Sequence, residues 1–446
     1  MTARKTWTSR IGFILASAGA AVGLGAIWKF PYMVGSNGGS AFLFPYIILT
    51  FTVGLTLLIA EVALGRAGKG GIVTAYRNLA GPKWVPWGFV GVATGFIVLS
   101  FYSAIGGWTL AYFVDALTGS TLITSKEQLG AHFGALTSNP ITALGFQWLF
   151  LAINCFIVAF DVSKGIERVS KIMMPLLFIL MIILIVRGLT LPGSVEGLRY
   201  LFSFDPSKLT WDALLQAMGF TFFSLAVGSG CMLTYGSYTK DSTNLVKSCF
   251  QIAVLTCIAS LLGGLMIMPA VFSLGLEPTG GPGLTFMTMP AVFAQLPMGQ
   301  LFAILFYLCI IVAAITSSVS MIEIVMAYLV EEKKMTRPKA SVLTTIALAI
   351  VGGLPCLSFG ILSDVTFFNH KTFFDIFDFM TSNLALPLGG LVILYLAGKL
   401  CWDRVKDDIL GHQPREGNSR ALSILRFSML VLSPIIVAIV LISGLI

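Results

Sequence analysis

Long apolar stretches separated by short polar segments run through the whole chain of 446 residues. A helix rises about 1.5 Å per residue, so roughly 20 apolar residues cross the hydrocarbon core of a membrane. By this criterion we expect an all-α integral membrane protein with eleven transmembrane helices. Their expected bounds are 11–34, 40–65, 86–117, 141–160, 168–190, 210–236, 244–273, 296–330, 338–359, 371–398 and 421–445.

Glycines interrupt the first stretch where a spanning helix should be most regular. Gly19 precedes the pentapeptide Ala21–Gly25 (AVGLG), and a near copy, Ala226–Gly230 (AVGSG), lies in the sixth stretch. Glycine weakens a helix, and non-helical backbone inside a membrane is tolerated only where it lines a cavity or is buried in protein. Small residues can also serve only to let helices pack closely. Two broken spans in corresponding positions favour instead the binding site of a secondary transporter.

The breaks fall in the first and sixth of the expected spans. This spacing predicts two units of five helices, 10–190 and 210–398, inserted in the membrane in opposite orientations. The eleventh helix, 421–445, is then an addition outside the repeats. The whole chain, 1–446, would form a single transporter domain.

Composition and charge exclude a soluble protein and indicate an orientation. Hydrophobic residues make up 57% of the chain and charged residues 11%. Most of the 28 Lys and Arg residues lie in segments that would share one side with the N-terminus. The positive-inside rule therefore predicts a multi-pass protein of the cell (plasma) membrane, with its N-terminus cytoplasmic and its C-terminus outside. The net charge of +8 reflects this topology, so we expect a lipid bilayer and no nucleic acid as partner.

Few residues inside the spans could carry chemistry. His132, His370 and His412 lie in loops or near span ends without the spacing of metal ligands, so we expect no enzyme. Seven cysteines, mostly within spans, predict no disulfide framework, and the sequence carries no signal of oligomeric state. A channel would gain nothing from two broken helices around a midplane site, and saturable sodium-coupled uptake would distinguish the two classes.

Some polar residues within apolar sequence are candidates for function. Glu61 is an intramembrane carboxylate, and Lys29 lies near one end of the first span, where snorkelling to the interface is the alternative. The Tyr102 hydroxyl needs a partner at its depth. Thr316, Ser317 and Ser318 are consecutive, so they cannot all face one direction. At least one of the three should face a cavity. Near the N-terminus, Trp7 is expected to act as an interfacial anchor.

Several motifs resemble the neurotransmitter:sodium symporter family, and within it the bacterial leucine-transporter-like members. They are Arg10–Ala16 (RIGFILA), Ala21–Gly25, Phe30–Pro31, Asn37–Phe42 (NGGSAF), Pro45–Tyr46, Ser163–Arg168 (SKGIER) and Thr316–Ser318. The resemblance covers essentially the whole chain and implies the leucine-transporter-like fold, with its inverted repeat and its broken helices 1 and 6. Family members commonly have twelve spans, so the eleven expected here lack only a helix outside the repeats.

This resemblance implies sodium-coupled secondary active symport of neutral hydrophobic L-amino acids, aliphatic and aromatic, into the cell by alternating access. The alternative is a sodium-coupled symporter of another broken-helix family with a different small zwitterionic substrate. Competition between substrates would distinguish the two.

The resemblance also implies a substrate site at the two breaks. The amides of Leu24 and Gly25 and the Tyr102 hydroxyl would hold the substrate carboxylate, since a half-helix N-terminus offers unpaired N–H groups. The full expected set of substrate-binding residues is Ala21, Leu24, Gly25, Val98, Tyr102, Phe223, Ser224, Ala226, Ser229 and Met321. Carbonyls around Ala21, Phe223 and Ser224 would meet the substrate amine. The side-chain pocket has no counter-charge, and the small Ala226 and Ser229 leave room for tryptophan.

Two sodium ions are expected by the same resemblance. One site comprises three carbonyls and two hydroxyls, those of Gly19, Val22, Ala313, Thr316 and Ser317. The other comprises Ala21, Ser224 and Thr256 with the substrate carboxylate. This second site departs from the family, because Ala26 and Thr256 stand where asparagines are expected, so it loses at least one oxygen.

Chloride remains an open question. Tyr46, Ser224 and Ser260 match the family's chloride position, whereas Phe220 replaces an amide side chain.

Four charged residues match the positions of gate pairs in the family. Lys29 and Asp378 would face each other across the outer vestibule, and Arg4 and Glu331 across the inner one. Separate solvated charges are the alternative, for which breaking a pair costs little.

The fifth span contains an expected hinge for inward release. Pro175 cannot donate its amide, so the Lys171 carbonyl loses its helical partner, and Gly165 supplies a flexible joint. We expect the segment 165–171 to unwind when the cytoplasmic side opens. A static proline kink is the alternative.

Overall fold

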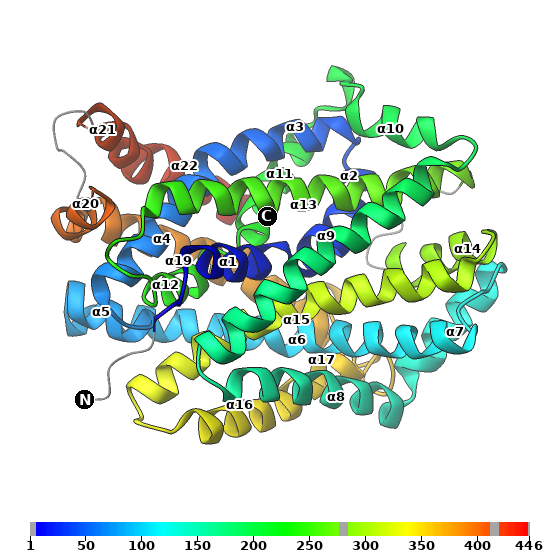
Figure 1. Ribbon diagram of the computed structural model, residues 1–446, viewed down its shortest axis with the longest axis horizontal. Helices are drawn as coiled ribbons and strands as arrows, with labels where there is room; N and C mark the ends of the chain where they lie inside the picture. Colours follow the sequence, from blue (N-terminus) through cyan, green and yellow to red (C-terminus); the bar gives the residue numbers. More distant parts are fainter. Residues whose placement is uncertain (1–5, 276–283, 411–418, 445–446) are drawn as a thin grey trace.

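The computed structural model describes residues 6–275, 284–410 and 419–444, which form helices and connecting turns without a strand (Figure 1). The helices of the first half are α1 (Arg10–Leu24), α2 (Phe30–Ser36), α3 (Ser40–Leu49), α4 (Leu55–Gly68), α5 (Ile72–Ala80), α6 (Val85–Thr118), α7 (Lys126–Ser138), α8 (Pro140–Ala159), α9 (Arg168–Leu189) and α10 (Ser194–Phe202). Those of the second half are α11 (Trp211–Ser224), α12 (Cys231–Gly236), α13 (Leu245–Ser273), α14 (Met289–Ala294), α15 (Gly299–Glu331), α16 (Arg337–Val351), α17 (Gly353–Leu357), α18 (Phe373–Phe379), α19 (Leu386–Tyr395), α20 (Trp402–Leu410), α21 (Ser419–Phe427) and α22 (Ser433–Ser443).

Short segments of wider or tighter helix, labelled η, continue or connect these elements. The π-helical ones are η1 (Gly25–Lys29), η2 (Thr50–Gly54), η4 (Ser163–Glu167), η6 (Leu284–Thr288), η8 (Met380–Ala385), η9 (Leu396–Leu400) and η11 (Ser428–Leu432), and the 3₁₀ ones are η3 (Pro82–Trp84), η5 (Pro206–Lys208) and η7 (Phe368–His370).

In the described residues, ten helical segments are long and apolar enough to cross a membrane. They are Arg10–Ser36, Ser40–Gly68, Pro82–Thr118, Pro140–Ala159, Ser163–Leu189, Leu245–Ser273, Gly299–Glu331, Arg337–Leu357, Phe373–Leu400 and Arg420–Ser443. These confirm ten of the expected spans and the all-α class. The remaining expected span, 210–236, is two short helices, α11 and α12, because the chain leaves the helix between them.

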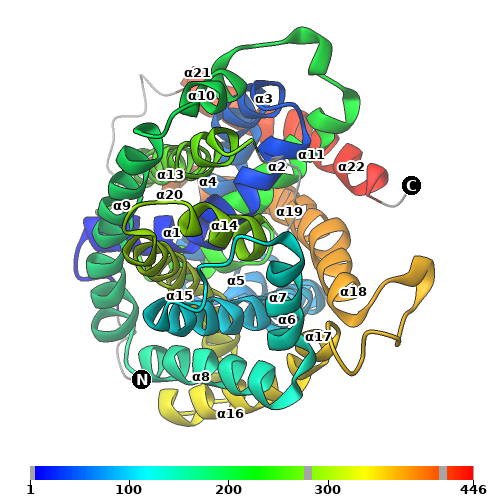
Figure 2. The same cartoon turned by 90° about the vertical axis from the view of Figure 1, so that its right-hand side faces the viewer.

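The spans run along the long axis of the molecule, as the view along that axis shows (Figure 2). The first span lies near the centre of the bundle, and α8 and α16 lie at one edge. Burial follows this arrangement, since 89% of the apolar window of Arg10–Ser36 is buried within the protein but only 28% of that of Arg420–Ser443. The first broken helix is therefore surrounded by protein, where irregular backbone can find partners.

Each break has a clear backbone cause. Gly23 interrupts the first span with φ −4° and ψ −148°, far from helical values. In the second break, Gly228 and Gly230 take φ of 93° and 84°, and Ala226 takes 52°. Glycine adopts positive φ without steric penalty, whereas Ala226 is held there against its preference.

Close glycine contacts hold α12 against α4. A Cβ at Gly65 would lie 1.8 Å from the Leu233 carbonyl oxygen, and a Cβ at Gly236 would lie 2.4 Å from that of Val62. Only glycine permits this approach of two backbones. The second half of the sixth span therefore packs directly on the second span.

Several shorter helices were not predicted as separate elements, namely α5, α7, α10, α14, α17 and α20. Each is shorter than a span, and most have no long apolar stretch. Short helices gain their stability from packing on the rest of the protein, so sequence pattern alone does not reveal them.

Candidate functional site

A cavity of about 40 Å³ lies where the two breaks meet. Its lining residues come from α1, η1, α6, α11, the second break, α12, α15 and α19: Ala20, Ala21, Gly25, Gly95, Val98, Tyr102, Phe222, Phe223, Ala226, Val227, Ser229, Cys231, Ser317, Met321 and Leu386. None of these side chains is charged. On the same measure a water molecule needs roughly 10–15 Å³. The cavity therefore has room for a few water molecules, and a larger guest requires side chains to move.

Eight of the ten expected substrate residues line this cavity. The two others lie beside it: Leu24 is buried and Ser224 donates its hydroxyl to the Thr221 carbonyl at 3.1 Å. The Phe223 carbonyl accepts the Ala226 N–H at 3.1 Å, so the turn of the second break already uses it.

The structure adds lining residues that the sequence analysis did not select. Gly95 and Cys231 lie close to selected residues along the chain, and Cys231 directly follows the second break. Leu386 comes from the tenth expected span, and nothing in its apolar surroundings distinguishes it from a packing residue.

Tyr102 joins the first break to its neighbouring helices. Its hydroxyl accepts the Leu24 N–H at 3.3 Å and donates to the Ala314 carbonyl at 3.4 Å. Next to it, the Gly25 N–H bonds to the Val22 carbonyl. The predicted carboxylate-binding groups therefore lie together, with one amide held by a hydroxyl that can also donate a hydrogen bond.

The first predicted sodium set is brought together around the same break. The Ser317 hydroxyl donates to the carbonyls of Gly19 at 3.2 Å and Ala20 at 2.8 Å, and Thr316 Oγ1 donates to the Ala313 carbonyl at 2.9 Å. A Cβ placed on Gly19 would lie 3.1 Å from Thr316 Cβ. Neutral carbonyl and hydroxyl oxygens of this kind suit a hard cation, and unwound helix supplies them.

The second predicted sodium set is less closely assembled. The Thr256 hydroxyl donates to the Ile252 carbonyl at 2.9 Å, one turn back in its own helix, as Ser224 does in α11. The hydroxyls of Tyr46 and Ser260, from the expected chloride position, lie 3.0 Å apart. The centroid of the Phe220 ring lies 5.1 Å from that of the Tyr46 ring, so an apolar ring packs against the tyrosine of this position.

Phe223 separates the small cavity from a larger one. The second cavity measures about 490 Å³, and Phe222, Phe223 and Leu386 line both. A Cβ at Gly25 would lie 3.2 Å from the Phe223 ring, and Lys29 Nζ lies 4.3 Å from the centroid of the same ring on the larger cavity's side. The ring is therefore a partition between the two cavities, with Gly25 and Lys29 as its neighbours.

The proposed outer gate residues both line the larger cavity, but they do not form an ion pair within 4.0 Å in the described residues. Lys29 contacts Phe223, as described above. Asp378 accepts a hydrogen bond from Ser382 Oγ at 2.7 Å. The structure therefore places both predicted gate residues on one cavity, and their pairing as a gate stays a prediction.

The opposite end of the molecule, where the described chain begins at Thr6, is closed by side chains. Trp7 is 2% exposed, and its ring nitrogen donates to the Tyr235 carbonyl at 2.9 Å, so it is a packed residue and the expectation of an interfacial anchor is wrong. Tyr238 donates to Glu323 at 2.6 Å, and Arg337 pairs with the same carboxylate at 2.6 Å. This network joins the segment before α1 to α12, α15 and α16.

The structure describes only one of the two residues of the predicted inner gate. Arg4 lies outside the described residues. Glu331 accepts the Gly71 N–H at 2.8 Å. Beside it, Glu332 pairs with Arg77. Burial raises the pKa of Glu332, but the hydrogen bonds from Arg77 and Thr74 together with the nearby positive charges outweigh burial and hold that pKa below its ordinary value.

The predicted hinge lies against both the N-terminal segment and the sodium set. Gly165 lies in η4, where a Cβ would be 2.3 Å from the Ile157 carbonyl oxygen. Glu167 accepts hydrogen bonds from the Thr8 N–H at 2.7 Å and pairs with Lys171 at 2.6 Å. The sequence alone does not reveal this role of Glu167, because Thr8 lies far away along the chain.

The residue before Pro175 contacts the sodium set. A Cβ at Gly19 would lie 3.4 Å from the Met174 sulfur. Pro175 lies inside α9, as expected.

Glu61 is buried in the second break without a cationic partner among the described residues. Its carboxylate accepts the N–H groups of Gly228 at 2.8 Å and Leu233 at 3.4 Å. The side chain is fully buried. Glu61 therefore supplies partners to the backbone groups that the break leaves free, which is a structural use of an intramembrane carboxylate.

Comparisons with known proteins agree with this arrangement. The sequence matches a family model described as the sodium:neurotransmitter symporter family over residues 4–126 and 138–446. It is 46% identical over 389 residues to the uncharacterized sodium-dependent transporter YhdH of Bacillus subtilis, covering 87% of this chain and 86% of that protein. It is 33% identical over 421 residues to an uncharacterized sodium-dependent transporter of Haemophilus influenzae, covering 91% of each.

Among solved structures, the fold is similar to a crystal structure of MhsT in complex with L-phenylalanine. The TM-score is 0.91 at 37% identity, and the match covers 99% of this chain and 100% of that one.

The second break yields a test of Glu61. In a Glu61→Gln variant the side-chain amide oxygen can still accept one of the two backbone N–H groups. The NH₂ group of the glutamine faces the second N–H and cannot accept it. Leaving a buried donor unpaired costs about 1–3 kcal/mol. We expect a lower melting temperature in detergent and faster amide exchange at 228–233. Glu196→Gln, which alters an exposed carboxylate paired with Arg199, is the control and should match wild type. An unchanged melting temperature and exchange rate for Glu61→Gln would contradict this role.

Proposed function

Because the chain belongs to the sodium:neurotransmitter symporter family, we propose that it carries neutral hydrophobic L-amino acids, aliphatic and aromatic, into the cell together with sodium ions. Transport proceeds by alternating access, in which a central site opens first to one side of the membrane and then to the other. The observation that carries this proposal is the cavity between the two helix breaks, whose lining combines polar backbone at one end with uncharged side chains around the rest.

The amino-acid substrate is supported by the chemistry of the cavity. The N–H groups near Leu24 and the Tyr102 hydroxyl suit a carboxylate, since they lie at a half-helix terminus. Val98, Ala226 and Met321 surround the space where a side chain would lie. A charged side chain there would be desolvated without a partner, which is costly. The similar protein MhsT was solved with L-phenylalanine, an aromatic member of the proposed class.

The size of the cavity indicates how a substrate enters. About 40 Å³ is too small for an amino acid without rearrangement. Phe223 is the partition toward the larger cavity, so rotation of its ring would join the two spaces. Met321 has a flexible side chain that can repack around substrates of different shape.

Orientation follows from the charges at the two ends. We place the N-terminal end in the cytoplasm, by the positive-inside rule. The closed network around Trp7 then seals the cytoplasmic side, while the 490 Å³ cavity with Lys29 and Asp378 is the outer vestibule. In this state the site would load from outside.

Sodium drives the transport, and we propose two ions per substrate. The set around Gly19, Thr316 and Ser317 is supported by the short contacts between its hydroxyls and carbonyls. The set of Ala21, Ser224 and Thr256 would be completed by the substrate carboxylate, which would link the ion directly to the substrate. Ala26 supplies no side-chain oxygen there.

The first test is of the substrate. We expect leucine uptake into proteoliposomes to require sodium and to be inhibited by phenylalanine and tryptophan but not by lysine or glutamate. Discrimination between apolar side chains should be shallow, at about 1–3 kcal/mol per methylene. Saturable sodium-driven uptake of another zwitterion, with no competition by leucine, would favour the alternative of a different broken-helix symporter. Replacing chloride with gluconate in the same assay measures chloride dependence.

The second test is of the ions. Thr316→Ala should raise the sodium concentration needed for half-maximal uptake by roughly tenfold or more, since a hydrogen-bonding group facing a charge contributes about 1.5–3 kcal/mol. Ser320→Ala removes a neighbouring buried hydroxyl outside the set and should leave that concentration unchanged. Reversal potentials should give two sodium ions per substrate. A measured ratio of one sodium ion per substrate would contradict the proposed site of Ala21, Ser224 and Thr256.

The third test is of the hinge. Unwinding of 165–171 would hydrate the sodium set through the contact between Met174 and Gly19. Pro175→Ala restores a helical hydrogen bond to Lys171, so we expect slower sodium release, reduced amide exchange at 165–171 and little change in substrate affinity. Pro45→Ala, in α3, is the matched control. If Pro175→Ala releases sodium at the wild-type rate, and if amide exchange at 165–171 is equally low in every state, Pro175 forms only a static kink.

A further inference from the structure

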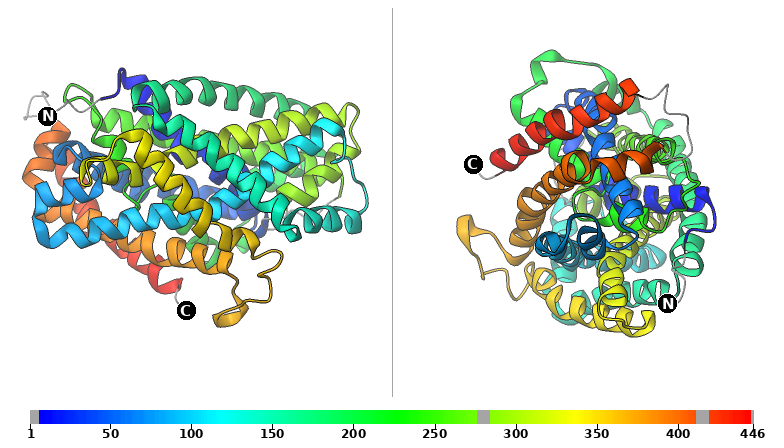
Figure 3. Two further views of the ribbon diagram at one scale, coloured as in Figure 1. Left: turned by 90° about the horizontal axis from the view of Figure 1, so that it is seen from below. Right: turned by 90° about the vertical axis from the view of Figure 1, so that its left-hand side faces the viewer.

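A groove of about 960 Å³ opens on the side of the bundle and shares no lining residue with the two central cavities. Its walls come from η2 and α4, the start of α13, the end of α20, α21 and η11. The volume is at the upper end of the roughly 300–1,000 Å³ that is typical of small-molecule sites. Figure 3 shows the same elements, with α20 and α21 in orange and red beside the blue second span.

The floor of the groove is apolar, and its polar groups are already satisfied. Phe51, Leu55 and Leu425 are among its lining residues. The hydroxyls of Thr56 and Ser428 lie 2.9 Å apart and bond across the groove floor. These groups therefore do not require water, and the floor suits hydrocarbon.

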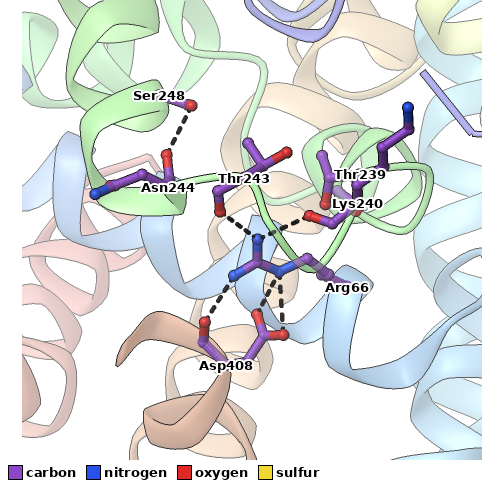
Figure 4. A network of polar contacts seen from close by, with 8 residues as sticks. Arg66, Thr239, Lys240, Thr243, Asn244, Ser248 and Asp408 are labelled. Atoms are coloured by element: carbon purple, nitrogen blue, oxygen red, sulfur yellow. Dashed lines mark hydrogen bonds and ion pairs between the residues drawn. The ribbon is translucent and has the colours of Figure 1, made fainter. Parts of the chain in front are cut away.

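Two polar residues at the start of α13 give the groove a cationic end. Lys247 is the one charged side chain among the described lining residues, and no carboxylate of the described chain lies within 4.0 Å of it. Asn244 caps α13 by accepting the Lys247 N–H at 2.9 Å through its side-chain oxygen. That bond leaves the amide Nδ2 of Asn244 as a donor. This nitrogen points away from the network of Arg66 and Asp408 (Figure 4).

Asp408, which directly precedes the lining residue Ile409, is paired with Arg66 within the protein. Arg66 is 3% exposed, and its Nε donates to both carboxylate oxygens of Asp408 at 3.0 and 2.9 Å (Figure 4). Its other nitrogens donate to the carbonyls of Asp408 at 2.6 Å and Thr243 at 2.6 Å. Arg66 thus fixes the end of α20 and the segment before Asn244, which are two walls of the groove. The Asp408 charge is thus taken up by Arg66, and among the described residues no carboxylate within 4.0 Å competes with a ligand for Lys247.

We propose that this groove binds an anionic phospholipid, with an acyl chain along the apolar floor and the phosphate at Asn244 and Lys247. A neutral phospholipid could fill the floor equally well, so the headgroup charge determines the preference. Basic pockets between helices at the membrane surface bind anionic headgroups, and each nearby Lys contributes about 1 kcal/mol, which corresponds to about fivefold in affinity.

Photolabelling of the full-length protein tests this proposal. Phosphatidylglycerol with a diazirine in one acyl chain would be crosslinked to the purified transporter in nanodiscs of phosphatidylcholine, and the labelled peptides mapped by mass spectrometry. We expect labels on the groove-lining peptides of η2–α4 and α21, competed by unlabelled phosphatidylglycerol about fivefold better than by phosphatidylcholine.

Matched variants assign the headgroup contact. Lys247→Gln should abolish the preference for phosphatidylglycerol. Lys164→Gln removes an equivalent exposed charge elsewhere on the molecule and should leave the preference intact. Both positions are exposed, and normal melting temperatures would confirm that the variants are folded.

Four results would overturn the proposal. The first three are equal competition by the two lipids in the wild type, a preference that persists unchanged in Lys247→Gln, and labels that spread evenly around the bundle. Absence of groove labels because a second copy of the chain covers this face would also overturn it, and crosslinked dimers would reveal that case.

Discussion

Backbone groups that leave a helix inside a membrane must find partners within the protein, because hydrocarbon offers none. This requirement governs both breaks. In the second break Glu61 accepts the N–H groups of Gly228 and Leu233. In the first, Ser317 donates to the carbonyls of Gly19 and Ala20, and Tyr102 accepts the Leu24 N–H. Without these side chains the irregular backbone would expose several unpaired groups, each costing about 1–3 kcal/mol.

The two sets of partners differ in a way that matters for the proposed function. Glu61 lies outside the cavity lining, so a ligand does not compete for its bonds. Ser317 and Tyr102 line the cavity, and their present partners are the carbonyls and amides that an ion or a carboxylate would use. Binding at the first break would therefore exchange one set of polar contacts for another. The second break would keep its internal support throughout.

The sequence was sufficient for the parts of the fold that depend on local chemistry. The repeated pentapeptide located both breaks, and eight expected substrate residues line one cavity. Residues whose role depends on distant contacts could not be predicted in this way. Leu386 reaches the cavity because α19 packs beside the second break, and Trp7 is buried because it bonds to Tyr235. The bounds of the two five-helix units remain a prediction.

The breaks are attached to different neighbours, and this arrangement bears on how the site could open. At the first break, a Cβ on Gly23 would lie 1.8 Å from Ser317 Oγ, which shows how closely α1 packs on α15. At the second, glycine contacts and Glu61 hold α12 on α4. A movement of α12 must therefore carry α4 with it, since their backbones touch without intervening side chains. The cavity lies between these two tightly packed groups. Displacement of one group against the other would open the site without breaking the contacts within either, so the close packing that supports each break is compatible with alternating access.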